Sequence, residues 1–267
     1  ASLKGRASAS AAFPAGAAAL AVDGSTETAW SADLQGEADP QITLDLGKPR
    51  EFGGLVVRWK QGQHASDYLV QLSDDGVRWR DVRTVVDGNG GDDYLALPES
   101  EARYVRLLVG DGPGRAFALA ELEVKPLAFA AHPNDFIKAM AAGSPKGWFP
   151  RGFSGEQPYW TIVGLDGGRE QGLIGEDGAV EIAKGGISIE PFVKVDGRWV
   201  GWADVQVSQS LQDNYLPIPT VTWKHAGFAL STTAFAAGRP GDSRVVSRHR
   251  LTNTRTTSRD YRLALAL

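Results

Sequence analysis

The chain has 267 residues, enough for one large domain or two ordinary ones, and no apolar run approaches the roughly 20 residues that a membrane-spanning helix needs. Its formal net charge is −4 with acidic and basic residues interleaved, which argues against a nucleic-acid-binding protein, and the lack of cysteine excludes disulfides and thiol chemistry. Glycine (32), proline (14) and tryptophan (8) recur against a single methionine, which is typical of an all-β protein.

The first half contains short segments in which apolar and polar residues alternate, as in strands with one buried face. This pattern predicts strands at 41–46, 68–73 and 104–109, and a last strand at 118–124. Proline cannot donate a hydrogen bond to a sheet, so Pro126 is predicted to end a first domain, a β-sandwich of residues 1–126.

Residues 127–158 have a different character, with aromatic residues spread through a Gly- and Pro-rich segment. We expect them to form a connector with a short helix at 136–142, which Asn134 and Asp135 would cap and Gly143 would end.

Strand patterns resume from residue 159. Residues 193–200 predict a hairpin with Asp196-Gly197 at its turn, a strong hairpin signal. Residues 261–267 alternate like a strand and then stop without a turn. We therefore expect 159–267 to be a second antiparallel β-sandwich that is incomplete, with more protein downstream.

Seven stretches of the first half follow one another in a recognisable order and spacing: 7–10 (Ala-Ser-Ala-Ser), 21–31, 42–49, 57–59, 67–79, 102–107 and 119–124. Each alone is a weak signal, but together they resemble the F5/8 type C, or discoidin, family, which includes many carbohydrate-binding modules of bacterial glycosidases. The resemblance implies a jelly-roll β-sandwich of the galactose-binding-like type that binds a ligand rather than catalysing a reaction.

The loop that begins at Asp23 is rich in carboxylate, hydroxyl and carbonyl oxygens, the ligands that Ca²⁺ prefers. In the family, a structural Ca²⁺ often sits at the matching loop and is closed by a glutamate of the last strand. The resemblance therefore implies Asp23, Ser25, Thr28 and Glu121 as ligands of a Ca²⁺ that braces the loop. The alternative is that Asp23 and Thr28 hydrogen-bond the loop backbone as an Asx-turn, without metal.

A second acidic loop, residues 87–93, does not match the EF-hand pattern, because its glycine is misplaced and Pro98 stands where the closing glutamate should be. We expect it to be a solvated hairpin tip.

Sugar recognition requires an aromatic face for C–H groups and planar polar groups for hydroxyls. Family members place this site on loops at one end of the sandwich. By position, the predicted ligand-binding residues are Gln63 and His64, in the loop after Trp59, and Arg115 and Phe117, before the last strand. His64 could also be a bystander and Arg115 a solvated side chain. Trp30, Trp59 and Trp79 lie in or beside strand patterns and are predicted to belong to the core.

The second half contains no recognised catalytic motif. Its short patterns at 160–161, 164–167, 189–192 and 216–219 are loosely similar to the β-sandwich that precedes an (α/α)6 barrel in several bacterial glycosidase families. A glycoside hydrolase needs two carboxylates about 5–10 Å apart, and a sequence cannot say which pair converges. The candidates are Glu170, Glu176, Asp177, Glu181, Glu190, Asp204 and Asp213.

The leading hypothesis is therefore a non-catalytic, glycan-binding N-terminal part of a larger carbohydrate-active enzyme, bacterial and secreted or periplasmic, with a catalytic domain downstream. Its partner would be a glycan or polysaccharide, with no nucleic acid. One alternative is a glycoside hydrolase that uses carboxylates of the second sandwich. The other is a discoidin-type adhesion module that binds protein or lipid, which the polar residues of the predicted loops disfavour.

Overall fold

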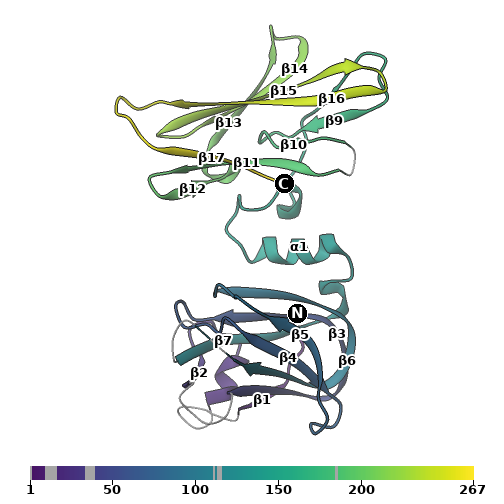
Figure 1. Cartoon of the computed structure of the whole chain (residues 1–267), viewed down its shortest axis with the longest axis vertical. Helices are drawn as coiled ribbons and strands as arrows, with labels where there is room; N and C mark the ends of the chain where they lie inside the picture. Colours follow the sequence, from purple (N-terminus) through teal and green to yellow (C-terminus); the bar gives the residue numbers. More distant parts are fainter. Residues whose placement is uncertain (1, 10–16, 34–39, 111, 113–115, 184–185) are drawn as a thin grey trace. The chain divides into compact units, whose positions relative to one another are not determined.

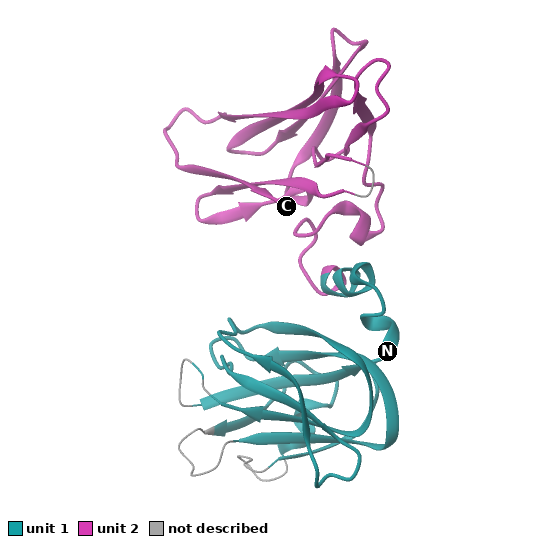
Figure 2. Ribbon diagram, turned by 45° about the vertical axis from the view of Figure 1, so that its right-hand side comes forward, with its two compact units in different colours: residues 1–140 teal, residues 141–267 magenta. Residues whose placement is uncertain are grey.

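The computed structural model describes residues 2–9, 17–33, 40–110, 112, 116–183 and 186–267. The chain forms two compact units, residues 1–140 and 141–267, which are coloured separately in Figure 2. Both units consist of antiparallel sheets, as the sequence predicts. No helix in the described parts of the chain is long and apolar enough to cross a membrane.

The first unit is a β-sandwich made of one seven-stranded sheet (Figure 1). The strand order is β2-β7-β3-β6-β4-β5, and β1 pairs with β3. The bounds are β1 Arg6–Ala9, β2 Trp30–Asp33, β3 Gln41–Trp59, β4 Tyr68–Ser73, β5 Arg80–Val85, β6 Asp92–Val109 and β7 Ala116–Lys125. Two short 3-10 helices flank these strands, η1 (Ala17–Ala21) before β2 and η2 (Leu127–Phe129) after β7.

Two long strands allow this single sheet to form both layers of the sandwich. β3 pairs with β1 near its start, through Ile42–Asp45, and with β7 near its end, through Gly54–Trp59. Its pairing with β6 shifts register at two places between these ends. The alternation at 41–46 predicted the first part of β3, but the sequence did not indicate that the strand continues to Trp59.

The core of this unit follows the predicted alternation. The predicted apolar faces of the three strands lie inside, with at most 5% of each residue exposed: Ile42, Leu44, Leu46, Tyr68, Val70, Leu72, Val105, Leu107 and Val109. Trp30 and Trp59 are buried with them, as predicted. Trp79 is only partly buried, and the guanidinium carbon of Arg106 lies 3.8 Å from its ring centroid.

The predicted short helix is present as α1 (Pro133–Ala142), but it begins three residues earlier than expected. Proline has no backbone N–H to leave unpaired and suits the first helical position, so Pro133 starts the helix. Asn134 and Asp135 consequently lie inside the first turn rather than capping it. The division between the two units falls within this helix, between Met140 and Ala141.

The second unit contains two antiparallel sheets. One has the order β12-β11-β10-β9-β8, with β17 pairing β11, and the other has the order β13-β14-β15-β16. The bounds of the first are β8 Thr161–Gly164, β9 Gln171–Ile174, β10 Val180–Glu181, β11 Ser188–Val195, β12 Arg198–Val200 and β17 Tyr261–Ala266. Those of the second are β13 Gln206–Gln212, β14 Leu216–Lys224, β15 Phe228–Arg239 and β16 Asp242–Asn253, and the 3-10 helices are η3 Arg151–Ser154 and η4 Trp202–Asp204.

The hairpin predicted in this unit is confirmed. β11 and β12 pair antiparallel, and Asp196 and Gly197 between them have positive φ angles of 50° and 80°. These angles are those of a tight hairpin turn, which Asp-Gly tolerates. The last predicted strand is also present, because β17 pairs with β11 from Tyr261 to Ala266.

Candidate functional site

One end of the first unit rests on a cluster of buried aromatic rings. The rings of Trp30 and Phe117 meet edge to face at 5.1 Å, and Trp59 meets Phe117 at 6.0 Å and Tyr68 at 5.6 Å. Edge-to-face pairs of this kind add to the stabilisation that burial alone provides. Figure 1 shows the strands that carry these rings, β2, β3, β4 and β7, in one unit. The cluster is a rigid support for the loops that join those strands.

The position of Phe117 corrects a prediction. Phe117 was expected to offer its ring to a ligand, but it is 1% exposed and packs within the aromatic cluster. The residue occupies an inward position of β7, where it is paired with Ala32 of β2. A buried ring cannot stack on a sugar, so Phe117 supports the loops and does not contact a ligand in this conformation.

Asp93, the second residue of β6, ties the aromatic cluster together. Its Oδ2 accepts hydrogen bonds from Trp59 Nε1 at 3.0 Å and from the Tyr68 hydroxyl at 2.8 Å. Burial and the negative charge of Asp93 raise the pKa of Tyr68, so this hydroxyl remains a donor. The neighbouring Asp92 pairs with Arg58. The expectation that 87–93 is merely a solvated hairpin tip is therefore wrong for its last two residues.

Residues 66 and 67 lie just before β4, which carries Tyr68 of this cluster, and main-chain hydrogen bonds connect them to Gly88 and to Gly110. The Ser66 carbonyl accepts the N–H of Gly88 at 2.9 Å, and the Asp67 carbonyl accepts the N–H of Gly110 at 2.9 Å. The Asp67 carboxylate also accepts the N–H of Asp87 at 3.3 Å. We call the described segments 60–67 and 86–91, together with Gly110 and Gly112, the loop rim. Because residues 66–67 are bonded to both neighbouring segments, these described parts of the rim are organised before any ligand arrives.

His64 and Gln63 lie on this rim, as the sequence predicted. Gln63 is exposed, and its carbonyl accepts the N–H of Ala118 at 2.9 Å. His64 is partly buried, and a β-carbon added at Gly90 would lie 2.6 Å from its Nδ1. Glycine at 90 thus leaves room for the imidazole between two loops. Arg115, the remaining predicted ligand-binding residue, lies outside the described residues.

The predicted metal loop, residues 23–28, forms a closed hydrogen-bonded turn. Asp23 Oδ1 accepts the N–H of Ser25 at 2.9 Å, which is an Asx-turn, and Asp23 Oδ2 accepts the Thr28 hydroxyl at 2.8 Å. Glu121, on β7, joins the loop because its Oε2 accepts the N–H of Gly24 at 3.1 Å. The four residues singled out from the sequence are therefore brought together.

The donor set of this loop fits a hard cation. Burial, together with the nearby negative charges of Asp23 and Glu123, raises the pKa of Glu121, and a cation would relieve that repulsion. Asp23 and Glu121 also line a hollow of about 540 Å³. Within the described residues no group of three or more His, Cys, Asp or Glu side chains could hold a metal, so hydroxyl and carbonyl oxygens would have to complete the shell.

Lys60 also contributes to this loop, although no sequence pattern singles it out. Its ammonium donates to the carbonyl oxygens of Thr26 at 2.6 Å and Glu27 at 2.9 Å. These contacts link the metal loop to the start of the loop rim. The connection joins residues that are 33 and 34 positions apart in the chain, so it can be recognised only in the folded structure.

Two of the carboxylates considered for catalysis in the second half are buried. Asp177 is 2% exposed, and Glu190 is 9% exposed and accepts the Ser188 hydroxyl at 2.8 Å. Burial, with a contribution from Asp177, raises the pKa of Glu190 to about 7. Such enclosure limits contact with a polysaccharide, so the geometry offers little support for a hydrolase that uses this pair.

Comparison with known families decides the identity of the first unit. Residues 6–122 match the model of the F5/8 type C domain. The N-terminal unit is an F5/8 type C domain. No curated protein matches the chain.

Several solved modules are similar to the F5/8 type C domain of this chain. Chitosan-binding module 1 of a chitosanase/glucanase from Paenibacillus sp. IK-5 is 31% identical, with 46% of this chain and 96% of that chain covered and a TM-score of 0.42. Module 2 of that enzyme, solved with chitotriose, is 25% identical, with 46% and 98% covered and a TM-score of 0.43. A Clostridium perfringens module solved with GalNAc-β-1,3-galactose is 27% identical, with 45% and 94% covered and a TM-score of 0.41.

Proposed function

We propose that the F5/8 type C domain binds a glycan at the loop rim without reacting with it. The observation that carries this proposal is a rim in which segment 60–67 is hydrogen-bonded to Gly88 and Gly110, on a domain of this family, with His64 and Gln63 on that segment. An imidazole nitrogen and a side-chain amide are polar groups that can hydrogen-bond the hydroxyls of a sugar. A rim that is already ordered loses little entropy on binding.

We also propose that the metal loop holds a Ca²⁺ through Asp23, Glu121, the Thr28 hydroxyl and an oxygen of Ser25. The raised pKa of Glu121 and the hollow beside it support this assignment. The ion would brace the loop, and through Lys60 it would steady the adjacent rim. It has no part in any chemical step.

The wider context is a proposal as well. The similarity of the second half to a sandwich that precedes a helical barrel supports a larger carbohydrate-active enzyme, secreted or periplasmic. Binding by the F5/8 type C domain would then raise the concentration of a catalytic domain on its polysaccharide. Sequencing the gene beyond Leu267 tests this directly, because an open reading frame without a catalytic domain would refute it.

The glycan proposal is tested by titrating the whole chain with chitosan oligosaccharides and with galactose-containing oligosaccharides in a calorimeter. We expect one of them to bind, and we expect His64→Ala to weaken that binding by about tenfold, the effect of one lost hydrogen bond.

His132→Ala is the matched control, because His132 is an exposed histidine of the same unit outside the rim. Its binding should equal that of the wild type. Equal binding by His64→Ala, or no binding to any glycan of a broad array, would refute the proposal.

A further inference from the structure

A hollow lies at one end of the second unit, between the edge strand β12, helix η4 and the turn that joins β14 to β15. It consists of two depressions of about 590 and 440 Å³, and both are lined by Asp204 and His225. We call it the Trp199 hollow and define it by Asp196, Arg198, Trp199, Asp204, Lys224 and His225. None of these residues belongs to the F5/8 type C domain.

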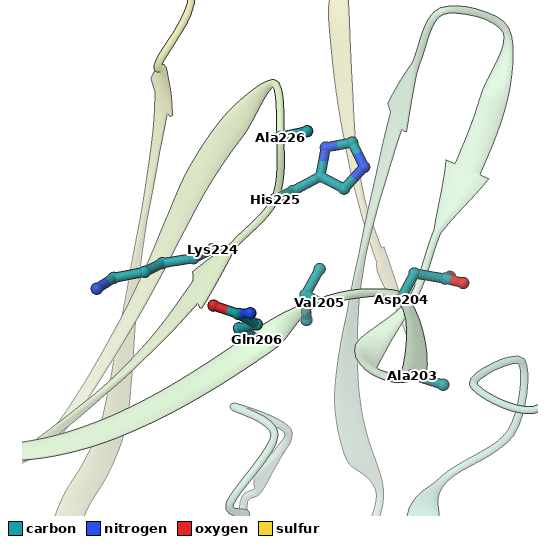
Figure 3. Close-up of a pocket in the computed structure, with 7 residues that line it drawn as sticks. All are labelled: Ala203, Asp204, Val205, Gln206, Lys224, His225 and Ala226. Atoms are coloured by element: carbon teal, nitrogen blue, oxygen red, sulfur yellow. The ribbon is translucent and has the colours of Figure 1, made fainter.

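His225 is held in a defined orientation. Its Nδ1 accepts the N–H of Gly227 at 3.2 Å, and its ring packs on Phe228 with 4.8 Å between centroids. A neutral imidazole whose Nδ1 accepts a hydrogen bond carries its proton on Nε2. Figure 3 shows the ring projecting to the same side as the Asp204 carboxylate, with Lys224 extending the other way. His225 therefore presents its Nε2–H to the hollow as a hydrogen-bond donor.

Asp204 supplies a fixed acceptor beside this donor. Its Oδ2 accepts the N–H of Gly201 at 2.9 Å, which closes the short helix η4 and holds the carboxylate in place. A carboxylate has lone pairs beyond the one used here, and these can accept from hydroxyl groups. Donor and acceptor thus face one space, which is the arrangement that neighbouring sugar hydroxyls require.

Trp199 gives the hollow an aromatic wall. It stands on β12, is 43% exposed, and its ring centroid lies 5.6 Å from the ammonium of Lys194. β12 is the edge strand of its sheet, so the indole is open to a ligand on one side. An indole face suits the apolar C–H patch of a pyranose ring.

The charges around the hollow favour an anionic ligand. Asp196 is paired with Arg255 at 3.6 Å and with Arg259 at 3.3 Å. Two guanidinium groups thus meet the one carboxylate of Asp196, and Arg198 lines the hollow with Asp204, so that cations outnumber carboxylates here by three to two. This local excess of positive charge contrasts with the net charge of −4 of the chain. A positive hollow concentrates an anion near it.

We propose that the Trp199 hollow is a second glycan site, separate from the loop rim, and that it takes an acidic glycan whose sugars carry carboxylates. The indole of Trp199 stacks on a sugar ring, His225 Nε2 and Asp204 bind hydroxyls, and Arg198 attracts the carboxylate. The site works whether or not the rim binds a glycan.

The test uses the whole chain carrying His64→Ala, so that the loop rim contributes little. Oligogalacturonate and a neutral galactose oligosaccharide of the same length are titrated at low salt in a calorimeter. We expect the acidic oligosaccharide to bind at least tenfold more tightly, and we expect its binding to weaken as salt is added. Equal binding of the two, or no binding of the acidic one, overturns the proposal.

Variants then locate the site. Trp199→Ala should weaken binding of the oligogalacturonate at least tenfold, whereas Trp199→Phe, which keeps a ring, should retain most of it. Tyr215→Ala is the matched control, because Tyr215 is 74% exposed at the far end of the β13–β14 hairpin from Gln206 and Lys224. Undiminished binding by Trp199→Ala, or an equal loss in Tyr215→Ala, places the ligand elsewhere and overturns the assignment. Thermal unfolding of each variant confirms that it is folded.

Discussion

The two units use their enclosed carboxylates in opposite ways. In the F5/8 type C domain, the partly buried Asp93 accepts hydrogen bonds from Trp59 and Tyr68 and so joins the start of β6 to the aromatic cluster. In the second unit, Asp177 and Glu190 are buried near each other, and the pKa of each is raised, mainly by burial. The difference teaches that an enclosed acid with good donors fixes a structure. An enclosed acid with few donors instead makes stability depend on pH.

The largest expected effect concerns the support of the rim. Phe117→Ala should lower the free energy of unfolding of the F5/8 type C domain by about 4 kcal/mol, since a fully buried ring is removed from the core. Chemical denaturation measures this loss. Phe117→Leu keeps most of the volume and should preserve glycan binding. If Phe117→Leu abolished binding while stability stayed normal, Phe117 would be a ligand contact after all.

Glu190→Gln tests whether a buried carboxylate makes the stability of the second unit depend on pH. The folded-state pKa of Glu190 is raised from 4.5 to about 7, so its contribution to stability is full below pH 4.5 and is lost as the pH rises through 7. The second unit should therefore lose about 3 kcal/mol of stability between these limits. Glu190→Gln stays neutral and should remove most of that loss. Denaturation curves at pH 4.5 and pH 8 measure it, and an unchanged pH dependence would contradict the assignment.

Asp93→Ala tests how firmly the rim is tied down. The Trp59 indole N–H and the Tyr68 hydroxyl would lose their acceptor inside the domain, which should cost about 2 kcal/mol of stability. Asp74→Ala is the control, because Asp74 is an exposed turn residue, and it should change stability by less than about 0.5 kcal/mol. Equal effects of the two substitutions would mean that Asp93 does not support the loops.

The smallest expected effect is that of calcium. Adding Ca²⁺ at ten times its dissociation constant to chelator-treated protein should stabilise the F5/8 type C domain by about 1.4 kcal/mol. Differential scanning calorimetry detects the shift. Asp23→Asn should remove it, and Asp74→Asn should not. If Ca²⁺ left the melting temperature of the domain unchanged, the calcium proposal would be refuted, and the Asx-turn of Asp23 would remain as the role of this loop.

Local patterns were enough to predict much of the fold. Alternation identified the buried faces of 41–46, 68–73 and 104–109, and Asp196-Gly197 identified the hairpin turn, because both signals arise between residues that are neighbours in sequence. The motif order of the first half likewise indicated the F5/8 type C domain, which the family match confirmed.

The site depended on contacts between distant segments. Phe117 has an ordinary strand sequence, and only its packing against Trp30 and Trp59 shows that it is buried. Asp93 and Lys60 acquire their partners from residues 25 to 34 positions away. The sequence by itself determined which residues form strands and which faces are apolar, since these are local properties. Tertiary structure alone decided which side chains meet at the rim, because that requires the sheet to fold back on itself.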